Sequence, residues 1–175
     1  MSTEPAGSAD VSSIEQTRWR IDPSRSRVEF QVKTYWGLMT VKGHFERYTG
    51  TLDLTANPAV ELIIESGSLD TKNKMRDKHL RSADFFDVEQ HPNVRFVSDS
   101  ATLADERLKV RGRLHARGES MPLELEAKLR RVGDELELEA ATEDDYHQLG
   151  MTWNRMGMLR TPGKLIVEGR LVEDT

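Results

Sequence analysis

The 175-residue chain contains no cysteine, which excludes disulfide bonds, thiolate metal sites and a cysteine nucleophile. It also lacks any apolar run near the 18 or so residues of a membrane-spanning helix. Residues 1–18 have neither the basic start nor the apolar stretch of a secretory signal. We therefore expect a cytoplasmic protein with no integral membrane segment.

Excess positive charge is missing as well. The net charge is -5 and the pI is about 5.6, so the overall field repels phosphate backbones and we expect no nucleic-acid partner. Charged residues make up 31% of the chain, hydrophobic residues 37%, and the mean hydropathy is -0.62. A thin-walled sheet that closes on itself suits this composition better than a solid helical bundle.

Apolar and polar residues alternate with period two from Trp19 onward, which is the pattern of strands with one buried face. The alternation is found at 28–33, 39–45, 52–54, 60–65, 94–98, 108–114, 123–129, 136–140 and 165–171. Turn signals separate these runs. About eight strands of this kind predict an antiparallel barrel or sandwich. Gly43, Gly112 and Gly169 fall on the inner face, where they indicate either empty interior positions or bulges that curve the strands.

One charged segment, 70–80, breaks the alternation and predicts a short surface helix with Asp70 or Thr71 as its N-cap. A turn with two adjacent aromatic residues follows at 82–87. We favour an ion-paired helix that covers one barrel end and is anchored by apolar side chains. Direct contact of this segment with a ligand is the alternative.

Residues with catalytic or metal-binding spacing are not visible. The five histidines form neither an HxH nor an HExxH pattern, and Ser120 is not in a GxSxG elbow. A glycine-rich phosphate loop is also missing. We therefore expect no catalytic residues, no metal and no cofactor. Aromatic and methionine side chains gather around Tyr35-Trp36 and Trp153, where they suit either an adaptable apolar ligand or an ordinary core.

Several motifs together resemble the YceI-like family. They are WRIDPSRSRVEF at 19–30, VKGHF with YTGTL at 41–52, SLDT through RDKHLRSADFFD to HPNVRF at 68–96, LHARGESMPL at 114–123 and LGM at 149–151. Arg25 and Tyr35 stand where members of the family usually have histidine.

Residues 1–18 are rich in small and polar residues without periodicity, which predicts a flexible tail. The resemblance implies, at 19–175, an all-β, eight-stranded antiparallel lipocalin-like barrel with a short helix over one end. It also implies that the barrel binds an amphiphilic lipid, most often a polyisoprenoid of the quinone or polyprenyl phosphate type, and that the protein forms a homodimer. Two other functions stay open: a barrel enzyme that isomerises or hydrolyses a small apolar substrate, and an interaction protein with a filled core.

The inner faces of the strands and the helical segment supply the candidate ligand-binding residues. These are Phe30, Val32, Tyr35, Trp36, Met39, Val41, Phe45, Leu62, Ile64, Leu80, Phe85, Phe86, Phe96, Val110, Leu114, Leu125, Met151 and Trp153. Arg76 and Lys78 are the candidates for contact with a polar head group.

Overall fold

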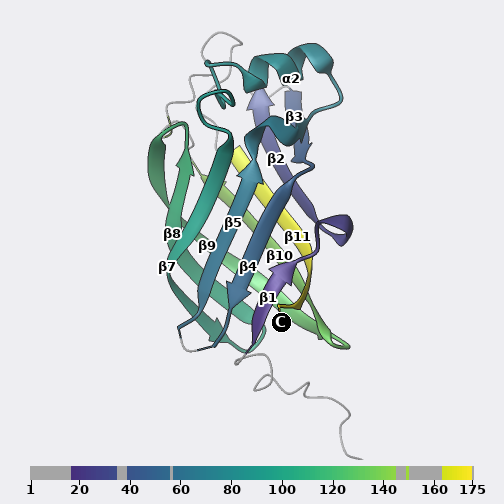
Figure 1. Ribbon diagram of the computed structural model, residues 1–175, viewed down its shortest axis with the longest axis vertical. Coiled ribbons are helices and arrows are strands. Elements are labelled where there is room, and N and C mark those ends of the chain that lie inside the picture. Colours follow the sequence, from purple (N-terminus) through teal and green to yellow (C-terminus); the bar gives the residue numbers. More distant parts are fainter. Residues whose placement is uncertain (1–16, 35–38, 56, 145–148, 150–162, 175) are drawn as a thin grey trace, which may run out of the picture.

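The alternating runs form the strands of a single antiparallel sheet in the computed structural model, which describes residues 17–34, 39–55, 57–144, 149 and 163–174 (Figure 1). Within these ranges the strands are β1 (Arg18–Ile21), β2 (Arg27–Thr34), β3 (Met39–Phe45), β4 (Tyr48–Asp53), β5 (Ala59–Glu65), β6 (Leu69–Asp70), β7 (Asn93–Ala104), β8 (Arg107–Ala116), β9 (Glu119–Val132), β10 (Glu135–Asp144) and β11 (Gly163–Glu173). The helices are η1 (Pro23–Arg25), η2 (Ser66–Ser68) and α2 (Lys74–Arg81).

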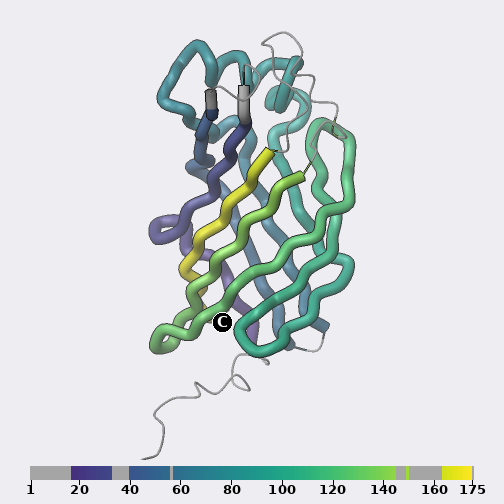
Figure 2. Tube along the Cα trace, turned by 180° about the vertical axis from the view of Figure 1, so that it is seen from behind, coloured from purple at the N-terminus to yellow at the C-terminus, as the bar shows by residue number. Residues whose placement is uncertain are grey.

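The sheet closes into a barrel because β1 pairs with both β4 and β11. Three of the barrel positions are interrupted strands: β1 continues as β2 after η1, β3 continues as β4, and β5 continues as β6 after η2. Counted this way, the described residues form eight positions in up-and-down order, which confirms the predicted eight-stranded antiparallel barrel. Figure 2 shows the wall formed by β2, β11, β10 and β9 side by side.

The first strand begins at Arg18, one residue before the predicted start of the folded domain. The Arg18 guanidinium is 2.9 Å from the Asp53 carboxylate on β4, and the Thr17 carbonyl accepts a hydrogen bond from the Leu54 amide. Residues 1–16 of the predicted tail lie outside the described residues. No helix among the described residues has the length and apolar character needed to span a bilayer.

Ser68 holds two of the interrupted strands together. Its hydroxyl donates to the Glu65 carbonyl at 2.7 Å and accepts from the Arg47 amide at 3.0 Å. The Ser68 carbonyl accepts from the Glu46 amide at 3.1 Å. These bonds satisfy backbone groups between β3 and β4 that have no partner in the regular strand pairing. Ser68 itself is only 3% exposed.

The predicted helix is present as α2, but its N-cap is Asn73 rather than Asp70 or Thr71. The Asn73 side chain accepts a hydrogen bond from the Arg76 amide at 3.0 Å. Thr71 is engaged elsewhere, because its amide and hydroxyl both donate to the Asp77 carboxylate, at 2.9 and 2.5 Å. The helix lies at one end of the barrel, beside β2 and β3 (Figure 1).

The interior positions opposite two of the glycines are filled, so the expectation of empty space there is wrong. A Cβ added to Gly43 would lie 2.4 Å from Cζ of Phe30, its cross-strand partner. A Cβ on Gly112 would lie 2.3 Å from the Val97 carbonyl oxygen and 2.7 Å from Cζ of Phe96. The missing side chains leave room for aromatic rings of neighbouring strands. The β7–β8 register also shifts between Ser98 and Ser100, so the irregularity lies on β7, opposite Gly112, and not at the glycine itself.

Candidate functional site

The barrel encloses an apolar cavity. The volume open to the centre of a water molecule is about 180 Å³, and residues from all eight barrel positions form its wall. Because successive side chains of a strand point to opposite faces, the apolar half of each alternating run lines this space. An interior of this kind is just wide enough for one small ligand.

Ten of the predicted residues lie on the cavity wall: Phe30, Val32, Phe45, Leu62, Ile64, Phe86, Phe96, Val110, Leu114 and Leu125. Val41 is buried but does not line the cavity, contrary to the sequence interpretation. Leu80 and Phe85, the candidates expected near the opening, are also buried and do not line it. Tyr35, Trp36, Met151 and Trp153 lie outside the described residues, as does the side chain of Met39. Whether the wall residues bind a ligand stays a prediction.

The sequence interpretation missed the wall contributed by the last two strands. Leu138 and Ala140 on β10 and Leu165, Val167 and Leu171 on β11 all line the cavity. Their signal was the same period-two alternation that identified the strands. Extending the inner-face prediction to every alternating run, including 136–140 and 165–171, finds them.

Three phenylalanines form the cavity wall near α2. The ring centroids of Phe30 and Phe45 are 5.3 Å apart, and the Phe86 ring meets both edge-on, at 6.3 and 5.9 Å. Phe86 comes from the turn after α2, so the helical segment contributes to the cavity as well as covering the barrel. Leu80 and Phe85 are buried beneath the segment, as an apolar anchor requires, and Phe86 faces the cavity. Contact of this segment with a ligand stays a prediction.

The two head-group candidates are not on the cavity wall. Arg76 donates from Nε to the Thr71 hydroxyl at 2.8 Å and from Nη2 to the Thr71 carbonyl at 2.6 Å, so the loop before α2 occupies its guanidinium. Lys78 lies on the exposed face of α2. Four polar residues also border the cavity among the described residues: Gln31, Thr51, Glu61 and Lys164. Arg95 holds Glu61 in an ion pair at 2.6 Å.

Arg25, one of the departures from the usual family sequence, lies in an ion-pair network outside the cavity. Its guanidinium donates two hydrogen bonds to the Glu135 carboxylate, at 2.8 and 3.0 Å, and a third to Asp22 at 2.8 Å. Hydrogen bonds from the Ser24 side chain, and then from Arg25, lower the pKa of Asp22 to about 2. The Arg25 bonds also lower the pKa of Glu135. This arrangement fixes the break between β1 and β2.

A closed up-and-down barrel with an apolar interior and a short helix at one end places the protein in the lipocalin-like class of barrels. The family model described as YceI-like domain matches residues 19–171. The chain therefore belongs to the YceI-like family.

Named relatives agree with this assignment. The chain is 36% identical over 112 residues to Protein YceI of Salmonella arizonae and 35% identical over 112 residues to the UPF0312 protein ECA1782 of Pectobacterium atrosepticum. Each match covers 62% of this chain and 58% of the relative, so the match spans less than two thirds of the curated relatives' length.

Solved structures share the fold at low sequence identity. BcnA of Burkholderia cenocepacia aligns with a TM-score of 0.77 at 16% identity, over 86% of this chain and 98% of BcnA. A structure described as a polyisoprenoid binding domain from Saccharophagus degradans, implicated in plant cell wall breakdown, aligns with a TM-score of 0.75 at 11% identity, over 91% of this chain and 100% of that one.

Proposed function

We propose that this protein binds an amphiphilic lipid of the polyisoprenoid type, with the apolar tail inside the barrel. The observation that carries the proposal is the cavity inside the barrel, whose wall is apolar at all but a few of its described positions. Membership of the YceI-like family and the likeness to a polyisoprenoid binding domain support the same ligand class. We further propose that the protein binds and does not chemically transform this lipid.

The cavity volume sets the length of tail that fits. About 180 Å³ corresponds to roughly a dozen water-sized positions, since one water needs ~10–15 Å³ by this measure. A methylene group is of similar size, so the cavity as it stands holds about two isoprene units. Burying a dozen such carbons contributes about 10 kcal/mol, at ~0.8 kcal/mol each, before the cost of association. A longer tail requires the wall to move or the tail to protrude.

A cavity of this size inside the barrel argues against a completely filled core, which was the interaction-protein alternative. The enzyme alternative needs a reactive group on the cavity wall. Among the described residues the ionisable ones that border the cavity are Glu61, whose carboxylate is paired with Arg95 at a partly exposed position, and Lys164. Glu61→Gln and Lys164→Met therefore test it: under our proposal neither variant alters the chemical identity of a bound lipid.

Native mass spectrometry of the freshly purified protein, followed by organic extraction, tests the binding function directly. A stoichiometric adduct that releases an isoprenoid supports the proposal.

Leu125→Trp adds a bulky ring to a half-buried wall position of β9 and should reduce lipid affinity about 50-fold, because displacing three methylenes costs about 2.4 kcal/mol. Glu124→Trp, its exposed neighbour, is the matched control.

The outcomes separate clearly. Equal lipid uptake by folded Leu125→Trp and Glu124→Trp proteins would contradict binding in this cavity. Phe96→Trp, on β7, repeats the test from another strand in case the first variant does not fold. Failure of the wild-type protein to retain or take up any polyprenyl compound would refute the proposed ligand class.

A further inference from the structure

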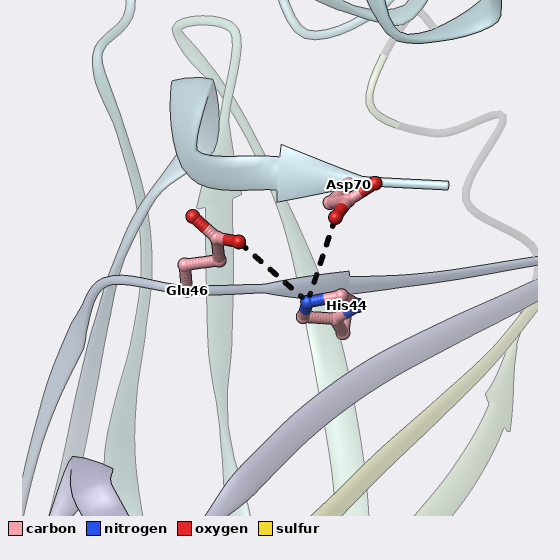
Figure 3. Close-up of side chains that lie close together, drawn as sticks. All are labelled: His44, Glu46 and Asp70. Atoms are coloured by element: carbon pink, nitrogen blue, oxygen red, sulfur yellow. Dashed lines mark ion pairs between the residues drawn. The ribbon is translucent and has the colours of Figure 1, made fainter. Parts of the chain in front are cut away.

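His44, Glu46 and Asp70 converge on the outer face of the barrel near α2 (Figure 3). Nε2 of His44 lies 3.9 Å from a carboxylate oxygen of Glu46 and 4.0 Å from one of Asp70. One ligand atom from each of the three residues lies within 4.8 Å of the other two. The cluster is separate from the cavity, because none of its members lines the wall.

The backbone fixes this grouping. His44 and Glu46 are two positions apart, so they extend from the same face of the chain as it leaves β3. Asp70 on β6 is the direct cross-strand partner of His44. The Glu46 amide donates to the carbonyl of Ser68, which lies in the connection between β5 and β6. This bond holds Glu46 close to Asp70. The convergence therefore follows from strand register and does not depend on a chance meeting of long surface side chains.

A cationic group already occupies the edge of the cluster. The Lys72 ammonium lies 3.0 Å from the same Asp70 oxygen that faces His44, and its side chain is 80% exposed. Two carboxylates thus attract positive charge to this point, and a mobile ammonium is easily displaced into solvent. Because the side chains of His44 and Glu46 are 35% and 56% exposed, water can reach the site and complete a coordination shell.

We propose that His44, Glu46 and Asp70 form a binding site for a first-row divalent cation, with zinc as the preferred ion. One imidazole nitrogen and two carboxylates are three ligands that zinc accepts, with water as the fourth. A tetrahedral zinc ion holds its ligand atoms roughly 3.3 Å apart. The His44 nitrogen, at 3.9 and 4.0 Å from the two carboxylates, needs to close on each by less than about 1 Å, and the carboxylate oxygens, which lie within 4.8 Å of each other, by at most about 1.5 Å. The imidazole favours zinc over magnesium and calcium, which prefer oxygen ligands.

The ion joins β3 to β6 where the sheet is weakest. These two strands share only two register pairs, His44 with Asp70 and Phe45 with Leu69. β6 leads directly into the Thr71–Asp77 contact that fixes the start of α2. A bound ion therefore tethers the helical end of the barrel to its wall.

Calorimetric titration of tag-free protein with zinc chloride tests the site. We expect one equivalent to bind, His44→Gln and Asp70→Asn to weaken binding at least tenfold, and Lys72→Met to tighten it by removing the competing ammonium. His115→Gln, which changes an exposed histidine on β8, is the matched control and should bind as the wild type does. Circular dichroism verifies that each variant is folded.

Hydrogen exchange provides a second measurement that does not depend on other zinc-binding groups of the chain. Zinc should slow amide exchange at 69–81 in the wild type and leave it unchanged in His44→Gln. Zinc binding that is unaffected by His44→Gln and Asp70→Asn, no protection at 69–81, or magnesium binding as tight as zinc binding would each overturn the proposal.

Discussion

The buried contact between Thr71 and Asp77 makes the strongest prediction about the helical end of the barrel. The Asp77 carboxylate is 7% exposed and accepts hydrogen bonds from both the amide and the hydroxyl of Thr71. Asp77→Ala removes the acceptor and leaves two buried donors unpaired. Hydrogen bonds to charged groups contribute about 1.5–3 kcal/mol each, so the variant should lose about 3 kcal/mol of unfolding free energy at the low end of that range. For a 175-residue protein this corresponds to a Tm about 6–12 °C lower.

A double-mutant cycle isolates this interaction from general damage to α2. Thr71→Val removes the hydroxyl but keeps the amide bond to Asp77 and should cost about 1–2 kcal/mol. Because the hydroxyl bond is already lost in Asp77→Ala, the double variant should cost at least about 1 kcal/mol less than the sum of the two single changes. Asp77→Asn is the conservative control, since its amide oxygen still accepts from Thr71.

Thermal and urea unfolding measure these free energies, and hydrogen exchange shows where the loss occurs. We expect faster exchange at 71–81 in Asp77→Ala, with the barrel strands β8 to β10 little changed. Strict additivity of Thr71→Val and Asp77→Ala, or a loss of protection spread evenly over the barrel, would refute the reasoning that this pair fixes the helical end.

Three further predictions concern the barrel itself. Gly112→Ala should lower the free energy of unfolding more than Gly43→Ala, because the new methyl group meets the Val97 backbone carbonyl in the first case and a side-chain ring in the second. Chemical unfolding measures both losses, and the reverse order would contradict the reasoning. Ser68→Ala should cost about 1–3 kcal/mol in the same assay, because buried backbone groups lose a partner, and an unchanged midpoint contradicts this. The pKa of Asp22 is lowered to about 2, so its carboxylate stabilises the fold above about pH 4 and loses this effect as the pH falls toward 2. The free energy of unfolding measured across that range should therefore depend less on pH in Asp22→Asn than in the wild type, and an equal dependence would contradict this prediction.

The strands were predictable because one face of each is buried, and burial imposes the period of two. The interruptions were not, because they depend on contacts between distant residues. Ser68 bonds backbone groups around Arg47, which lies 21 residues away. Likewise, the sequence shows that Gly43 faces inward, but only the β2–β3 register reveals that the Phe30 ring fills the space beside it.

The candidate site was also predictable only where it depends on the burial of one strand face. Inner-face positions such as Phe96 and Leu114 follow directly from alternation, and the structure places both on the cavity wall. The partner of Arg76 was not predictable, because positive charge near the barrel end does not reveal that the guanidinium donates to Thr71. The His44–Asp70 proximity was hidden for a further reason. It joins residues 26 positions apart through a two-pair register that no local spacing pattern encodes.

The departure at Arg25 allows a last prediction that separates the polar surface from the cavity. Arg25→His restores the residue usual in the family and removes the paired hydrogen bonds to Glu135. Arg25 is exposed and does not line the cavity, so the variant should lose little stability and should retain the co-purifying lipid at wild-type stoichiometry. Native mass spectrometry and thermal unfolding measure the two quantities, with Glu135→Gln as the control that breaks the same pair from the other side. A loss of lipid in Arg25→His but not in Glu135→Gln would mean that Arg25 acts on the ligand itself, and the assignment of its guanidinium to the β1–β2 break would then be wrong.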